Sequence, residues 1–150
     1  MDGRSCFALY RLSSVGRGTD RPFERLDAPW IGMAEFAAYM NRRSVPGVRF
    51  VPEQFTPDAG LYTGEPCQGV RLIVTRRNAL ESMLMGMEIA SALAKLYPGK
   101  LDVARMIELV GNGATIQMLG NAEAPSTIVA GWKNGLQAFQ KMRAKYLLYR

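Results

Sequence analysis

The chain of 150 residues contains no histidine. This absence excludes histidine-based catalytic triads, histidine metal ligands and histidine proton relays, so any general acid or base must be a carboxylate, a tyrosine, a lysine or a cysteine. The two cysteines, Cys6 and Cys67, are too few for a disulfide framework, and both are expected to be free, buried thiols. No apolar run reaches the roughly 18 residues that a membrane-spanning helix requires, and the short apolar patch near the first residue does not resemble a signal peptide.

The chain also lacks the motifs and charge runs that bind phosphate or nucleic acid. There is no Gly-Lys-Ser/Thr, and Arg21 stands where a dinucleotide fingerprint starting at Gly16 and Gly18 would need its third glycine. The net charge is +6, which favours anionic partners in a general way, but the basic residues occur singly or in pairs. We therefore expect no nucleic-acid partner, no membrane partner, no cofactor and no metal ion.

The apolar periodicity predicts an α+β domain, with a small mixed sheet packed against helices and a helical C-terminal half. Pro52 and Pro57 should confine one of the strands to an edge or end it early. Asn78 and Glu81 have the spacing of a capping box at the start of a long helix. The expected strands cover residues 5–12, 48–51 and 70–75, and the expected helices cover residues 33–41, 78–97, 102–111 and the C-terminal stretch. The last helix carries an apolar stripe of Trp132, Leu136, Phe139, Met142 and Tyr146.

A polar loop with the sequence SVGRGTDRPFERLDAPW covers residues 14–30. Arg17 and Arg21 are planar donors that suit a carboxylate, Thr19 offers a hydroxyl, and Glu24 offers an acceptor. This mixture fits recognition of a polyhydroxy ligand that bears an acid, such as a carboxylated sugar. Composition alone favours the alternative, an internally bonded loop in which Arg17 or Arg21 holds Glu24 and Phe23 enters the core.

The same loop closely resembles the GRGT-x-x-PFE…APW signature of a bacterial family of exo-β-N-acetylmuramidases, which remove terminal N-acetylmuramic acid from peptidoglycan fragments. Three more segments resemble family motifs in the same order, namely PGVRFVPEQFTP, YTGEPCQGVRLIVT and FQKMRAKYLLY. The resemblance covers about residues 14–150. Residues 1–13 form an atypical N-terminal segment, since Leu9–Leu12 stand where the family has a Glu-Gly-Thr-Asn-like segment, and Arg76 replaces a commonly acidic residue.

This resemblance implies that residues 14–150 are a C-terminal auxiliary domain, and that a separate N-terminal Rossmann-like domain supplies the proposed catalytic carboxylate. By motif position, Arg17, Thr19 and Glu24 would face the cleft between the domains and bind substrate, with Tyr62 and Glu65 as further wall residues. The catalytic residues are then unknown in this chain, which is expected to be inactive alone. Its partners would be a peptidoglycan-derived sugar and the N-terminal domain, and relatives are often secreted or periplasmic. The alternative is a non-catalytic fragment or carbohydrate-binding module.

Overall fold

The structure is a computed structural model that describes residues 15–16, 19–21 and 23–148. The strand expected over residues 5–12 lies outside this part of the chain, as do Cys6 and Arg17. The described strands are β1 (Arg25–Ala28), β2 (Val48–Phe55) and β3 (Cys67–Val74). The helices are α2 (Met33–Arg42), α3 (Ser82–Leu96), α4 (Ile107–Val110), α5 (Gly113–Gly120), α6 (Pro125–Gly131) and α7 (Lys133–Arg143), with short 3₁₀ turns at Arg77–Ala79 and Ala104–Met106.

The three strands form one sheet in the order β1-β3-β2, so β3 is central. Both pairings are antiparallel, whereas a mixed sheet was expected; the predicted α+β class is confirmed. The prediction of an edge position for the strand that contains Pro52 is also confirmed, because β2 pairs only with β3 among the described strands. Proline has no N–H to donate and is tolerated at such an edge.

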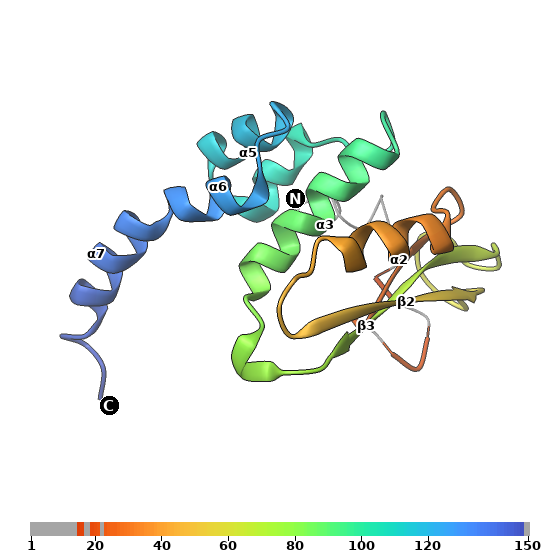
Figure 1. Cartoon of the computed structure of the whole chain (residues 1–150), viewed down its shortest axis with the longest axis horizontal. Helices are drawn as coiled ribbons and strands as arrows, with labels where there is room; N and C mark the ends of the chain where they lie inside the picture. The colour runs from red at the N-terminus through yellow and green to blue at the C-terminus, as the bar shows by residue number, and fades with distance from the viewer. Residues whose placement is uncertain (1–14, 17–18, 22, 149–150) are drawn as a thin grey trace, which may run out of the picture.

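One face of the sheet is covered by α2, α3 packs against α2, and the shorter helices α4, α5 and α6 gather beyond α3 (Figure 1). The core lies between these layers because every second strand residue points toward the helices. Its largest fully buried side chains include Phe36 and Met40 from α2, Phe50 and Val70 from the sheet, Leu93 from α3 and Ile128 from α6.

Polar contacts attach α2 to its neighbours. The Asn41 side chain donates to the carbonyl of Phe50 at 2.7 Å and accepts from the N–H of Phe50 at 3.1 Å, which satisfies backbone groups of β2 at the sheet edge. Arg43 donates through two nitrogens to Glu88 of α3, at 2.7 and 3.0 Å. Glu88 is only 6 % exposed, so the carboxylate of this ion pair is buried between the two helices.

Two expected helix limits were also wrong. The long helix begins at Ser82 after a 3₁₀ turn, and its N-cap, Glu81, makes no side-chain capping bond, so the predicted capping box does not form. The final helical stretch is divided at Trp132, whose Nε1 donates to the Thr115 hydroxyl at 2.8 Å. Beyond this break, α7 extends away from the rest of the molecule (Figure 1).

Candidate functional site

The loop before β1 is closed by its own hydrogen bonds. The Thr19 hydroxyl donates to the carbonyl of Gly16 at 2.6 Å and accepts from the N–H of Arg21 at 3.2 Å, and the N–H of Phe23 donates to the carbonyl of Val15 at 2.8 Å. Gly16 has φ +72°, a conformation that favours glycine. These bonds hold the described residues of the loop together, and Thr19 takes part in two of them while keeping one lone pair.

The described side chains of this loop do not form the Arg21–Glu24 pair or the buried Phe23 of the internally bonded alternative, and its Arg17–Glu24 version lies outside the described residues. Arg21 is exposed and contacts its neighbour Asp20 at 3.4 Å rather than Glu24. No hydrogen bond or ion pair of the Glu24 carboxylate is found within the described residues, although the Glu24 carbonyl accepts from the N–H of Leu72 at 2.8 Å. Phe23 is 73 % exposed and does not enter the core. The described part of the loop thus presents a cation and an acid to solvent from a fixed backbone.

An ion-pair network lies directly below the loop on the sheet. Arg25 of β1 donates to both carboxylate oxygens of Glu53 on β2, at 2.9 and 3.2 Å, and to Asp20 of the loop at 3.0 Å. Its guanidinium also lies 4.8 Å from the ring centre of Phe55. The hydrogen bonds to Glu53 raise the pKa of Arg25, so the Arg25 guanidinium stays charged throughout the physiological range.

The second loop, between β2 and β3, packs against the residues that follow β1. The N–H of Gly64 donates to the carbonyl of Pro57 at 2.9 Å, and the N–H of Glu65 donates to the carbonyl of Tyr62 at 3.0 Å. The Tyr62 hydroxyl accepts from the indole Nε1 of Trp30 at 3.2 Å. Glu65 is exposed.

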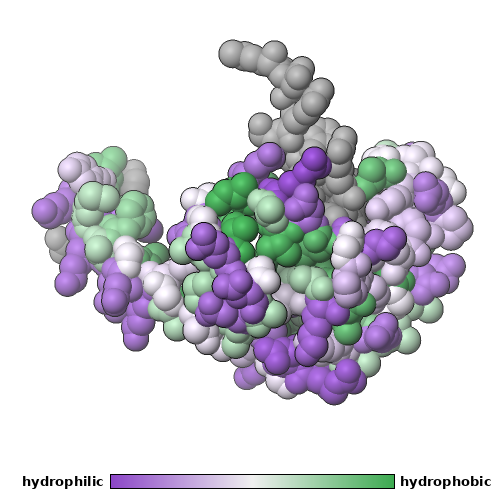
Figure 2. Space-filling model, turned by 90° about the horizontal axis from the view of Figure 1, so that it is seen from above, coloured by the Kyte–Doolittle hydropathy of each residue, from purple (hydrophilic) through white to green (hydrophobic). Residues whose placement is uncertain are grey.

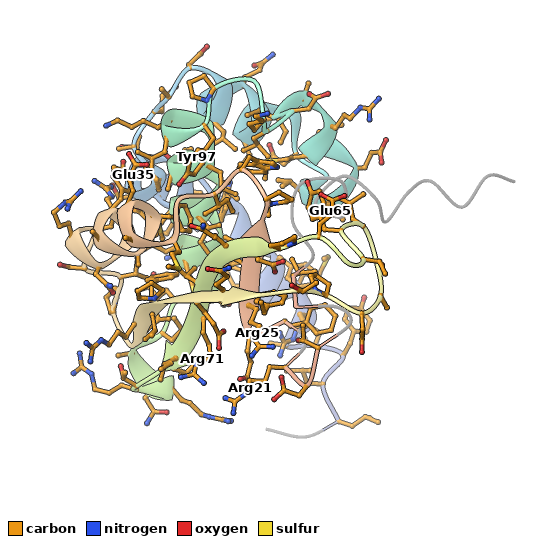
Figure 3. The ribbon with its side chains drawn as sticks, turned by 90° about the vertical axis from the view of Figure 1, so that its right-hand side faces the viewer. Arg21, Arg25, Glu35, Glu65, Arg71 and Tyr97 are labelled. Carbon is orange, nitrogen blue, oxygen red and sulfur yellow. The ribbon has the colours of Figure 1, made fainter. Side chains whose placement is uncertain are left out.

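Trp30 continues this contact into an aromatic cluster. Its ring meets the ring of Tyr97 edge to face at 5.4 Å, and the Tyr97 hydroxyl accepts from the N–H of Gly32 at 3.1 Å. Burial is the main cause that raises the pKa of Tyr97, with a smaller contribution from the nearby Glu35 carboxylate. Tyr97 and Glu35 lie together in Figure 3, on the far side of the sheet from Arg21 and Arg25. The position of Tyr97 in a helical apolar face predicts only core packing, so the sequence gives no signal for its hydrogen bond to Gly32.

The structure brings only some of the predicted site residues together. Tyr62 and Glu65 share one turn, and Thr19 lies two residues before the exposed Arg21. The Glu24 carbonyl is bonded to Leu72 of β3, and the second loop joins β3 at Cys67. Five residues of strand separate Leu72 from Cys67, a distance of roughly 16 Å. Arg17 lies outside the described residues. The use of all five residues in one site stays a prediction.

Two hollows lined by described residues lie in the helical half. One of about 480 Å³ is lined by α2, α3 and the turn between α5 and α6, including Arg43 and Lys95. The other, about 300 Å³, is lined mainly by apolar side chains such as Met83, Leu109 and Trp132. Within the described residues, no group of three metal-ligating side chains and no helix long and apolar enough to cross a membrane is found.

The apolar side chains of α7 are exposed in the described chain. None of its residues is buried, and Leu136, Phe139 and Met142 are each at least half exposed. The polar residues of this helix include Lys133, Lys141 and Arg143 and no acid. Figure 2 shows apolar and polar surface side by side on the projecting arm.

Comparison with known proteins assigns the class of this domain. The family model described as "Exo-beta-N-acetylmuramidase NamZ, C-terminal" matches residues 6–149. The chain therefore belongs to the family of C-terminal domains of exo-β-N-acetylmuramidases, which confirms the resemblance. The domain boundary at residue 14 stays a prediction.

Two individual proteins show what the chain is similar to. It is 35 % identical over 139 residues to the peptidoglycan β-N-acetylmuramidase NamZ of Bacillus subtilis, a match that covers 91 % of this chain and 34 % of that protein. The crystal structure of a DUF1343 family protein from Bacteroides fragilis has a TM-score of 0.80 at 22 % identity and shares the fold over 98 % of this chain and 40 % of that one. The chain thus spans well under half the length of either protein.

Proposed function

We propose that this domain binds the N-acetylmuramic acid end of peptidoglycan fragments and forms one side of the active-site cleft of a β-N-acetylmuramidase. The observation that supports this most directly is the loop before β1, which holds Arg21 and Glu24 in solvent on a backbone closed by its own hydrogen bonds, in a chain of this family. A preformed loop binds with less loss of conformational entropy than a flexible one.

In this proposal, Arg17 and Arg21 recognise the lactyl carboxylate of the sugar acid, because a guanidinium donates two parallel hydrogen bonds to a carboxylate. Thr19 holds the loop shape and offers its free lone pair, and Glu24 accepts from sugar hydroxyls. Tyr62 and Glu65 of the second loop contact the further units of a ligand longer than one sugar.

We also propose that the N-terminal Rossmann-like part, as expected for longer members of the family, docks on α7. An isolated helix of 11 residues is marginal in water, and its exposed apolar stripe needs a cover. The stripe is continuous with the apolar hollow at Met83, Leu109 and Trp132, since Trp132 belongs to both. The catalytic carboxylate would then come from the docked domain, and the chain alone would bind the sugar without hydrolysing it.

Binding to two related sugars tests the proposal. Titration of the chain with N-acetylmuramic acid and with N-acetylglucosamine, which lacks the lactyl carboxylate, followed by NMR, should show roughly tenfold tighter binding of the former, as expected for one charge-assisted contact. Arg17→Gln and Arg21→Gln should each reduce this preference, whereas Arg77→Gln, at an exposed arginine of the 3₁₀ turn before α3, should not. Equal affinity for both sugars would contradict the assignment.

A hydrolysis assay tests the division of labour between domains. The chain alone should release no chromophore from a chromogenic N-acetylmuramide. Clear turnover, retained after purification to homogeneity, would show that the catalytic group lies in this chain.

A further inference from the structure

The outer face of the sheet, opposite the helices, carries three arginines. Leu26, Val70 and Phe50 point into the core from the three strands, so their neighbours of opposite parity point away from it. Arg25 of β1 lies directly opposite Arg71 of β3, and Arg71 lies opposite Val51 of β2.

Arg49 of β2 belongs to the same face. It lies opposite Ile73, two residues along β3 from Arg71, which makes it a diagonal neighbour of Arg71 at roughly 7–8 Å. We call Arg25, Arg49 and Arg71 the outer-face arginines. Figure 3 shows Arg25 and Arg71 on one side of the sheet, with Arg21 of the loop beside them.

The charges of this cluster are compensated unequally. Asp20 and Glu53 both bind Arg25. Asp27, two residues further along β1, is fully buried beside the Cys67 thiol. Within the described residues, neither Arg49 nor Arg71 forms an ion pair, so the centre of the face has an excess of positive charge.

Arg71 is the group that most requires a partner. Its Nε is buried and has no hydrogen-bond acceptor within the described residues. A buried donor without an acceptor is costly, more so when it is charged, and like charges directly opposite each other on two strands destabilise a sheet. Folded proteins rarely leave such a donor unmatched unless a water molecule, an ion or a ligand completes the site.

We propose that the outer-face arginines form a binding site for an oxyanion, a carboxylate or a phosphate group, centred on Arg71. Arg71 supplies the central pair of guanidinium donors, and Arg49 supplies a second cation from the neighbouring strand. The Arg25–Glu53 ion pair lies beside them and holds Arg25 in place. Guanidinium forks match the two oxygens of either anion. This inference does not depend on the proposed sugar specificity, because it concerns the sheet surface rather than the loop.

The site is tested by anion-dependent stability. Thermal unfolding of the chain should be followed in inorganic phosphate and separately in acetate, at constant ionic strength maintained with chloride. At least one of the two anions should raise the Tm in a saturable manner, and the anion that does so identifies the chemical class. If neither anion raises the Tm above the chloride reference, the proposal is overturned.

Variants locate the site. Arg71→Met should abolish the anion-dependent rise in Tm and leave the Tm in chloride equal or higher, because it removes an unmatched buried donor. Arg49→Gln, at an exposed position, should weaken the apparent affinity several-fold without changing the Tm in chloride. Arg77→Met, away from this face, should respond like the unmodified chain. An undiminished anion response in both the Arg71 and Arg49 variants, or a clearly lower Tm of Arg71→Met in chloride, would overturn the assignment.

Discussion

The close approach of β1 to Gly69 leads to a sharp prediction about the sheet that supports both proposed binding surfaces. Gly69 lies opposite Asp27 in the ladder between β1 and β3. A Cβ added at Gly69 would lie 1.9 Å from the carbonyl oxygen of Leu26 and 2.7 Å from the Cα of Asp27. Both atoms belong to the backbone, so no side-chain rotation can relieve the contact. This explains why the segment CQGV has glycine where a β-branched residue would otherwise favour the strand.

The expected cost of Gly69→Ala follows from the displacement. Restoring even a 3.0 Å contact requires β1 to move by about 1.1 Å, which is enough to break ladder hydrogen bonds of ordinary length. The loss of two or three such bonds, at about 1 kcal/mol each, together with looser packing of the buried Leu26 and Ala28, predicts a destabilisation of about 3 kcal/mol or more. For a chain of this size the Tm should fall by about 10 °C.

The same substitution in α3 is the matched control. Gly86 lies inside the helix, and an added Cβ there meets no atom within 4 Å. Gly86→Ala should therefore stabilise the chain by about 0.5–1 kcal/mol through helix propensity. Urea unfolding followed by circular dichroism compares the two variants. A Gly69→Ala variant that unfolds with the same midpoint as the unmodified chain would refute the pairing of β1 with β3.

Three further predictions concern ionisable and exposed groups. Glu53→Gln should lower the free energy of unfolding by about 1–2 kcal/mol, measured in urea, because Arg25 loses its bidentate partner. Burial raises the pKa of the Cys67 thiol to about 12. The thiol of the unfolded chain ionises at lower pH, so the folded state retains a proton that the unfolded state has lost. The free energy of unfolding should therefore fall between about pH 9 and 12, by up to about 4 kcal/mol. The Cys67→Ala variant should show a shallower decline over the same pH range. Because the apolar face of α7 is exposed, the unmodified chain should self-associate at high concentration in sedimentation, whereas the double variant Leu136→Ser/Phe139→Ser should sediment as a monomer at the same concentration and unfold at nearly the same midpoint, since both side chains are half exposed.

The parts of the fold that the sequence predicted are those governed by local periodicity. Residues 33–41 repeat apolar side chains at helical spacing, and α2 covers Met33–Arg42 with Phe36, Ala37 and Met40 buried. The strand expected over residues 70–75 forms the end of β3, with Val70 buried and Arg71 on the opposite face. In each case the side chains that decide the structure lie within a few residues of one another.

The capping box failed because a distant turn controls the start of α3. The N–H groups of Thr75 and Arg76 both donate to the carbonyl of Gly47, at 2.8 and 3.3 Å. Gly47 lies so close that an added Cβ would be 2.4 Å from the carbonyl of Arg76 and 2.9 Å from the nitrogen of Leu80. This tertiary contact holds the segment in a 3₁₀ turn and delays the helix to Ser82, which a local spacing rule cannot detect.

The last helix shows the limit of periodicity in another way. Of the stripe predicted from Trp132 to Tyr146, only Leu136, Phe139 and Met142 lie within α7, and each is at least half exposed. A period of 3.6 residues indicates that one side of a helix will be covered and does not indicate by what. Trp132 is the exception, since its indole bonds to Thr115 and ends the continuous helix there.

The loop part of the candidate site could be predicted from the sequence, because a backbone motif defines it. The arginine cluster on the sheet could not, because it depends on how the strands are paired. The glycines and prolines of residues 16–29 predict a constrained polar loop, and Arg21 and Glu24 are both exposed in it. The alternation in VRLIVT also places Arg71 on the face away from Val70. What the sequence cannot supply is the pairing of Arg71 with Arg25, some 46 residues earlier, because a shift of one residue in β1 would replace Arg25 by Leu26 at that position. The outer-face arginines can therefore be recognised as a site only once the strand register is known. The Gly69→Ala variant tests the register and the site together. A displaced β1 should weaken the anion-dependent rise in Tm as well as the stability of the fold.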